Sequence, residues 1–161
     1  MPKLDPHGVY YMGVDPGQSG GIAVIKSTGQ VIQLEAMPAT ERDVFDAVCY
    51  LGNESVNAVI EKVHSMPQQG VSSTFKFGMG YGGLRMALIA ADIPFDEVTP
   101  QTWQKALGVV KRNAKTESKN DHKKKLLQKA QQLFPGIKVT LKTADALLLA
   151  EYCRRTCMGI K

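Results

Sequence analysis

Short runs of apolar and β-branched residues open the chain and are separated by turn-forming residues. Residues 10–14 and 21–25 are two such runs, and the sequence Asp-Pro-Gly-Gln-Ser-Gly between them predicts a β-hairpin. A third run at residues 30–35 follows a Ser-Thr-Gly turn. The beginning of the chain therefore predicts a three-stranded antiparallel meander.

The apolar spacing becomes helical after Thr40, a suitable N-cap, and stays helical to Leu51. Residues 57–61 (Asn-Ala-Val-Ile-Glu) then form a compact apolar run that ends in a carboxylate. A strand that follows a helix favours a crossover into parallel pairing. We therefore predict that this fourth strand lies parallel to the first, in a mixed sheet.

The second half of the chain alternates loops and helices with one further strand. In order, the pattern predicts a loop at 66–73, a glycine-rich segment at 78–83 leading into a helix at 84–91, a strand at 95–98, and helices at 100–107, 121–133 and 143–156. We expect a single α/β domain over residues 1–161, with a five-stranded mixed sheet and helices on both faces.

Length and composition agree with one globular domain. The chain has 161 residues, of which 43% are hydrophobic and 22% charged, and no apolar run is long enough for a membrane-spanning helix. We therefore expect a soluble protein without a membrane partner. The first residues lack the pattern of a secretory signal, which favours the cytoplasm of a bacterial or phage-infected cell, or an organellar matrix. The three cysteines have no metal-ligand spacing and are expected to be free thiols.

Positive charge is concentrated between residues 111 and 129. This segment has eight basic residues against two acidic ones, a balance of +6, whereas the whole chain has a net charge of +5. The remainder therefore sums to −1. A basic block on a nearly neutral domain fits a partner with a phosphate backbone. A solvated helix face is the alternative explanation.

Three acidic residues stand where the predicted elements begin or end. Asp15 follows the first strand, Glu61 ends the fourth, and Asp145 lies in the first turn of the last helix. If the first and fourth strands are parallel neighbours, Asp15 and Glu61 meet at one sheet edge. Carboxylates held that close raise each other's pKa unless they share a proton or bind a cation. Oxygen ligands suit Mg²⁺.

Each of these acids also has an ordinary explanation when it is taken alone. Asp15 suits a turn, Asp145 suits the helix dipole, and Glu61 suits the exposed end of a strand. Their combination with a basic segment favours the functional interpretation.

Four segments resemble, in order, the motifs of the RuvC-type Holliday junction resolvases of the ribonuclease-H-like superfamily. They are Met-Gly-Val-Asp-Pro-Gly-Gln-Ser-Gly at 12–20, Val-Ile-Glu at 59–61, Thr-Pro-Gln-Thr-Trp-Gln-Lys at 99–105 and Ala-Asp-Ala-Leu-Leu-Leu-Ala at 144–150. Residues 78–82 (Gly-Met-Gly-Tyr-Gly) are most similar to phage and chloroplast members. The resemblance covers most of the chain.

The resemblance implies a ribonuclease-H-like fold and a metal-dependent endonuclease that resolves four-way and related branched DNA as a homodimer. It implies two-metal hydrolysis with Mg²⁺, for which Mn²⁺ substitutes, leaving 5′-phosphate and 3′-hydroxyl ends. The implied metal ligands are Asp15, Glu61 and Asp145, with Asp15 bridging the two ions. Lys105 and Lys119 are expected to approach DNA phosphates near the cut.

One departure from the family pattern concerns the metal ligands. The family usually has a fourth ligand, carboxylate or histidine, three or four positions before the last acid. Here those positions hold Lys142 and Leu141. Either water completes the shell, or Lys142 contacts a phosphate instead, or activity is weakened.

Aromatic rings between residues 64 and 81 are able to stack on unpaired bases, although core packing explains them equally well. The residues expected to contact DNA are His64, Phe75, Phe77, Tyr81, Lys111, Arg112, Lys115, Lys123 and Lys142. The helix at 84–91 is a candidate dimer interface, through Met86, Ala87, Ile89 and Ala90, although core packing explains these residues equally well.

Two rival functions remain open on the sequence. Asp-Pro-Gly-Gln-Ser-Gly also resembles the phosphate-binding hairpin of sugar kinases and actin-like ATPases, which need two such lobes where this chain has room for one. A non-catalytic or weakly active junction-binding protein would explain the absent fourth ligand.

Overall fold

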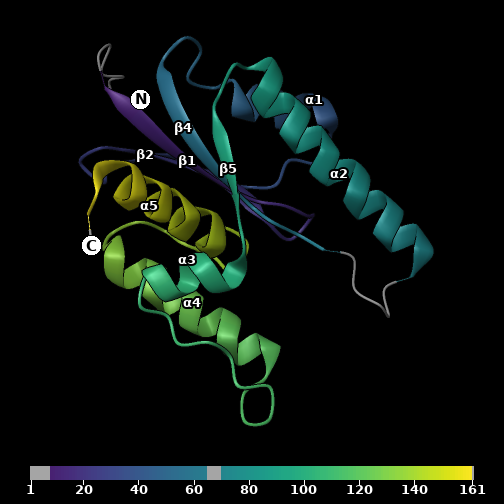
Figure 1. The fold of residues 1–161 in the computed structure, drawn as a ribbon, viewed down its shortest axis with the longest axis vertical. Helices are drawn as coiled ribbons and strands as arrows, with labels where there is room; N and C mark the ends of the chain where they lie inside the picture. Colours follow the sequence, from purple (N-terminus) through teal and green to yellow (C-terminus); the bar gives the residue numbers. More distant parts are fainter. Residues whose placement is uncertain (1–7, 65–69, 161) are drawn as a thin grey trace.

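The computed structural model describes residues 8–64 and 70–160 (Figure 1). At its centre lies a five-stranded sheet with the order β3-β2-β1-β4-β5. The strands are β1 (Val9–Asp15), β2 (Gly21–Lys26), β3 (Val31–Ala36), β4 (Ser55–Glu61) and β5 (Phe95–Val98).

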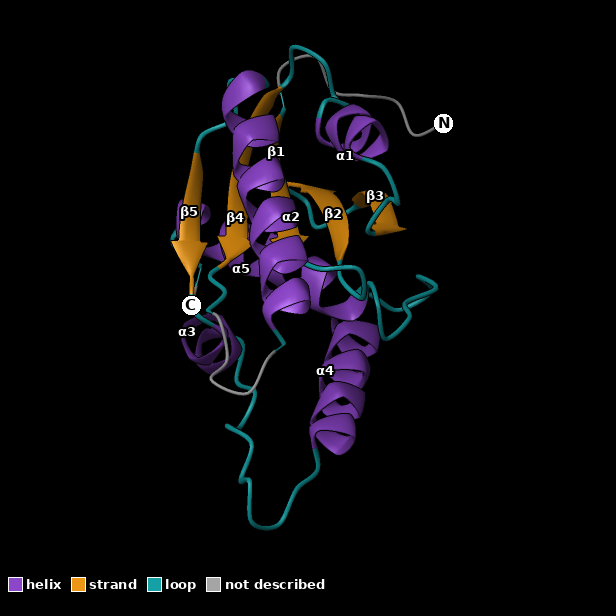
Figure 2. Ribbon diagram, turned by 90° about the vertical axis from the view of Figure 1, so that its right-hand side faces the viewer, coloured by secondary structure: helices purple, strands orange, loops and turns teal. Residues whose placement is uncertain are grey.

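Helices cover both faces of the sheet (Figures 1 and 2). One face carries α1 (Glu41–Val48) and α2 (Val71–Ala90), and the other carries α3 (Pro100–Ala106), α4 (Lys119–Leu133) and α5 (Ala144–Met158). β1 pairs antiparallel with β2 and parallel with β4, and β4 pairs parallel with β5. The predicted meander, the parallel crossover and the mixed sheet with helices on both faces are all confirmed.

Alternation along the central strands divides the core into two layers. Tyr10, Met12 and Val14 of β1 pack in the layer beneath α1 and α2, whereas Tyr11 packs in the layer beneath α5. This follows from the two-residue period of a strand, in which successive side chains point to opposite faces. Odd-numbered positions of β1 therefore face α5.

Gly13 allows α5 to lie directly on β1. A Cβ atom at Gly13 would overlap the carbonyl oxygen of Ala146 and the amide nitrogen of Ala150. Both of these α5 positions are alanines, whose small side chains let the helix backbone approach the strand, and both are fully buried. The close approach thus brings the first turn of α5 to the end of β1.

The long helix α2 corrects one prediction. Residues 71–73 were expected in a loop and 78–83 in a glycine-rich approach to a helix, but all of them are helical. Glycine disfavours helix by about 1 kcal/mol per residue relative to alanine. Packing of Leu84 and Leu88 into the core offsets this cost. The rest of the predicted loop, residues 66–69, lies outside the described part of the chain.

Three smaller findings complete the fold. Helix α4 begins two residues before the predicted start, because Ser118 caps it by accepting a hydrogen bond from the Asp121 amide at 3.1 Å. The three cysteines are free, as predicted. Among the described helices, none combines the length and apolar character needed to cross a membrane.

Replacing Gly13 with alanine is expected to lower the free energy of unfolding by about 3 kcal/mol, since the added methyl group forces α5 away from β1. Urea denaturation followed by circular dichroism measures the change. Gly80→Ala is the control, because a Cβ there meets nothing within 4 Å, and it should stabilise α2 by about 0.5–1 kcal/mol. Equal stabilities for Gly13→Ala and the parent would show that α5 does not need this contact.

Candidate active site

Asp15 and Glu61 end neighbouring parallel strands. The register of β1 and β4 pairs Val14 with Ile60, so the next residues, Asp15 and Glu61, come side by side. Alternation places Asp15 on the same face as Tyr11 and Gly13, and Glu61 on the same face as Val59. Both carboxylates therefore lie on the face of the sheet that α5 covers.

Asp145 reaches this sheet end from the first turn of α5. Thr143 precedes the helix and accepts a hydrogen bond from the Thr140 amide at 3.0 Å, which holds the chain as it enters α5. Because α5 lies on β1 at Gly13, its N-terminus comes close to the end of that strand. The three acids predicted to meet are thus brought to one end of the sheet.

The three carboxylates have raised pKa values. Burial raises the pKa of Asp15 well above its usual range, and the negative charges of Asp145 and Glu61 add to this. Burial also raises the pKa of Glu61 to about 7 and that of Asp145 to about 6. Asp145 is the neighbouring charge that raises the Glu61 value further. The cluster therefore has an excess of negative charge that the protein does not fully neutralise.

Glu61 is held by a buried tryptophan. The Nε1–H of Trp103 donates a hydrogen bond to Oε2 of Glu61 at 2.7 Å, and the indole is fully buried. This bond favours the charged form of Glu61 and lowers its pKa against the effect of burial. Trp103 thus orients one carboxylate oxygen. Nothing in the sequence predicts a role for this tryptophan, although it lies within the motif at 99–105, because its contact with Glu61 joins residues 42 apart.

Helix α4 supplies positive charge to the cluster. Lys123 lowers the pKa values of Asp15 and Asp145 against the effect of burial, and His122 acts in the same direction on Asp145. Nε2 of His122 lies 3.0 Å from Oε1 of Gln104 on α3. The histidine was missed from the sequence, where nothing distinguishes it within a basic helix.

The donor chemistry of the site fits a hard divalent cation, because three carboxylates with unneutralised charge offer the oxygen ligands that Mg²⁺ prefers. They are not a ready-made ligand set, however. Across residues 8–64 and 70–160, no group of three or more His, Cys, Asp or Glu side chains is placed to hold a metal ion. At the position of the usual fourth ligand, Lys142 and Leu141 are both exposed.

Comparison with known proteins identifies the architecture. No protein-family model matches the sequence, and no curated protein matches it. Among solved structures, Thermus thermophilus RuvC in complex with a Holliday junction substrate matches over 94% of this chain and 97% of its own, with a TM-score of 0.67 and 15% identity. The chain has the fold of RuvC. A second T. thermophilus RuvC structure matches over the same shares, with a TM-score of 0.59 and 16% identity.

The remaining predicted basic residues lie around the RuvC-like sheet without reaching the carboxylates. Lys105 is exposed on α3, and Lys119 is exposed at the start of α4. Between these helices, Lys111 and Lys115 are exposed, whereas Arg112 donates a hydrogen bond to the Glu117 carbonyl oxygen at 3.0 Å. Lys123 is the member of the predicted set whose charge acts on two of the acids.

Of the ring-bearing residues predicted to contact DNA, three lie on α2, on two sides of that helix, and His64 follows β4. Phe75 is 68% exposed, and His64 is exposed just after β4. Phe77 and Tyr81 are half-buried, with the Phe77 ring beside Gly17 and Tyr81 packed on the core. Helix periodicity explains the separation of Phe75 from Phe77 and Tyr81, and the sequence did not indicate it because the predicted helix began only at residue 84.

The raised pKa of Asp145 predicts the direction of a stability change with pH. The folded state keeps a proton that the unfolded state releases above about pH 4, so stability falls as pH rises from about 4 to about 6. Asp145→Asn removes this loss and should raise the free energy of unfolding at pH 8 by roughly 2 kcal/mol, with little change at pH 4. Denaturant titrations at the two pH values measure it.

Asp121→Asn is the matched control, because Asp121 also lies in the first turn of a helix but has a lowered pKa through its hydrogen bond with Ser118. It should lose stability at pH 8. Adding Mg²⁺ at pH 8 should raise the melting temperature of the parent more than that of Asp145→Asn. Lower stability of Asp145→Asn at pH 8 than of the parent would contradict the electrostatic account.

Proposed function

We propose that the chain is a divalent-metal-dependent endonuclease that resolves four-way and related branched DNA junctions. One observation carries the proposal: at one end of a RuvC-like sheet, Asp145 and Glu61 raise the pKa of Asp15, and Asp145 also raises that of Glu61. Placing three half-buried carboxylates close together, without full compensation of their charge, does not stabilise a fold. The T. thermophilus RuvC structure that shares this fold contains a Holliday junction.

In this proposal Asp15 is the central ligand, because its pKa responds to both other acids. Glu61 offers its second oxygen, since Trp103 already holds Oε2. Lys123 contacts the phosphate being cleaved and balances its charge. Divalent ions bound to these acids, Mg²⁺ or Mn²⁺, would activate water and stabilise the leaving oxygen of the phosphodiester.

The basic surface supports a DNA partner. Exposed lysines of the α3–α4 connection and of α4 lie on the same side of the sheet as the carboxylates, so a backbone bound there passes close to them. The residues proposed to contact phosphates are Lys105, Lys111, Arg112, Lys115, Lys119, Lys123 and Lys142. His64 and Phe75 are proposed to meet unpaired bases.

A second candidate function is junction binding with weak or no cleavage. The observation in its favour is Lys142 at the position of the usual fourth ligand, combined with three carboxylates that do not form a ready-made metal cage within the described residues. The same protein would then recognise branched DNA through its basic surface. Cleavage assays separate the two functions.

A homodimer would let two active sites cut a junction symmetrically. The outer face of α2 supports this assembly, because Met86 is 61% exposed and Ile89 58% exposed one helical turn apart. Gly82 lies on the same face and leaves the backbone open to a close neighbour. Ala87, named with these residues from the sequence, is buried in the core instead and does not contribute.

Asp15→Asn is expected to abolish cleavage of a synthetic four-way junction while binding to the junction remains, because the amide keeps the shape of the side chain but not its charge. Cleavage is measured with Mg²⁺ and with Mn²⁺ on a panel of four-way junction, fork, flap, duplex and RNA–DNA hybrid. Asp96→Asn, at an exposed position of β5, should cut at the parental rate.

Two results would overturn the proposed function. Near-parental cleavage by Asp15→Asn would show that the site is wrong. Absence of cleavage by the parent with either metal, together with tight junction binding, would favour the second candidate. ATP hydrolysis by the parent would point instead to the kinase-like alternative.

Met86→Glu combined with Ile89→Glu should convert a dimeric parent into a monomer at micromolar concentration, because the charges cannot be buried between two α2 helices. Light scattering gives the mass. Ile137→Glu, an exposed apolar position between α4 and α5, is the control and should stay dimeric. A monomeric parent would remove the assembly from the proposal.

A further inference from the structure

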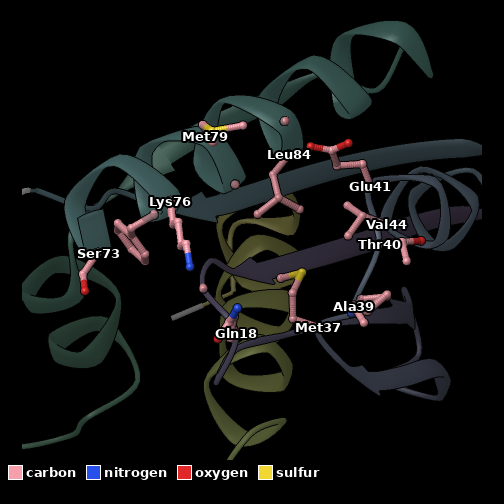
Figure 3. Close-up of a pocket in the computed structure, with 15 residues that line it drawn as sticks. Gln18, Met37, Ala39, Thr40, Glu41, Val44, Ser73, Lys76, Met79 and Leu84 are labelled. Atoms are coloured by element: carbon pink, nitrogen blue, oxygen red, sulfur yellow. The ribbon is translucent and has the colours of Figure 1, made fainter. Parts of the chain in front are cut away.

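A cavity of about 400 Å³ lies between α2, the turn that follows β1, and the connection from β3 to α1 (Figure 3). It opens at the same end of the sheet as the three carboxylates, but on the α2 side of that end. Gly17 and Gln18, which line it, follow Asp15 by two and three residues. A DNA strand that crosses the ends of β1 and β4 would therefore reach both.

The walls of the cavity are mainly apolar. Met37, Val44 and Leu84 line it together with the ring of Phe77, whose edge would lie 3.1 Å from a Cβ atom on Gly17. Gly17 has a φ of +99°, a backbone conformation that other residues rarely adopt, and its missing side chain leaves room for the ring beside the turn. Such walls suit the flat face of a nucleobase.

Polar groups are few and lie at separate places. The ammonium group of Lys76 and the amide of Gln18 point toward one another at the mouth (Figure 3). Within the described residues, Lys76 takes part in no ion pair. Glu41 lies at the N-terminus of α1 and offers a carboxylate acceptor of the kind that binds exocyclic amino groups of bases.

We infer that this cavity, the α2 pocket, holds one unpaired nucleotide of the DNA substrate, with its base against the apolar wall and its phosphate on Lys76. The inference rests on the proposed function, because branched DNA such as a fork or a flap has unpaired nucleotides at its branch point. A free apolar ligand would leave the charge of Lys76 without a partner. A duplex would not enter, since its bases are stacked and paired.

Methionine methyl groups provide a direct test. The chain has seven methionines, of which Met37 and Met79 line the α2 pocket, whereas Met86 and Met158 are exposed elsewhere. Adding a single-stranded tetranucleotide to protein labelled in its methionine methyl groups, without metal, should shift the Met37 and Met79 resonances and leave those of Met86 and Met158 in place. A blunt duplex of the same sequence should shift neither pair.

A substitution that fills the α2 pocket provides a second test. Gly80 lines the pocket and has open space around it, so Gly80→Leu should fill the cavity without disturbing the fold. Its affinity for the tetranucleotide should fall about tenfold, the effect of losing one stacked base. Gly80→Ala favours helix without filling the cavity and should bind within about twofold of the parent.

Lys76→Met should weaken binding and reduce its dependence on salt concentration, because one phosphate contact is lost. Lys138→Met, which removes a similar exposed charge between α4 and α5, is the control. Lys76→Arg should restore most of the affinity.

The outcomes of these experiments test nucleotide binding in the α2 pocket separately from nuclease activity. The inference about the α2 pocket is overturned if the Met37 and Met79 resonances do not shift. It is also overturned if Gly80→Leu and the parent bind the tetranucleotide with equal affinity, even if the parent cuts junctions. If the Met37 and Met79 resonances shift selectively but the parent cuts no DNA, nucleotide binding in the α2 pocket is supported and the proposed nuclease activity is overturned. Shifts caused by apolar peptides but not by the tetranucleotide would assign the cavity to a protein partner and overturn the inference.

Discussion

Direct contact between the backbones of α5 and β1 at Gly13 is the constraint on which the candidate site depends. No side chain fits between the strand and the helix there. The contact sets the depth of α5 on the sheet and, since Asp145 directly precedes Ala146, one of the contacting residues, it also sets where that carboxylate meets Asp15. A larger residue in β1 would preserve the apolar pattern of the strand and still separate the acids. Core packing and chemistry are therefore linked through one glycine.

Two acids of α5, the buried Glu151 and the half-buried Asp145, show how a carboxylate neutralised within the protein differs from one that is not. Burial acts to raise the pKa of Glu151, but hydrogen bonds from Arg154 and Arg155 more than offset it, and the net shift is downward. These bonds are 2.8 Å and 2.7 Å long. For Asp145, six residues earlier, the charges of Lys123 and His122 do not offset the effect of burial, and its pKa is raised. The protein thus neutralises one acid by its own arginines and leaves the other available for a cation.

The sequence was sufficient for the strands and their pairing, and so for placing Asp15 and Glu61 at neighbouring strand ends, because period-two alternation and strand ends are local signals with a single geometric meaning. It was insufficient for α2. Four glycines between residues 78 and 83 predict a loop on propensity, whereas packing of Leu84 and Leu88 decides in favour of helix. The role of Trp103 could not be predicted from the sequence either. Its hydrogen-bond partner Glu61 is distant along the chain, and no local pattern shows that an indole donates a hydrogen bond.

The position of positive charge relative to the acids bears on the absent fourth ligand. A carboxylate there would add a fourth negative charge to a cluster that is already insufficiently neutralised. With Lys142 in that place, and Lys123 acting from α4, the site has less negative charge and more cationic surface near the sheet end. Such a balance favours the phosphate backbone over a tightly held resident metal. Metal ions would then bind most firmly together with DNA, whose phosphate oxygens complete the set of ligands that the protein leaves open.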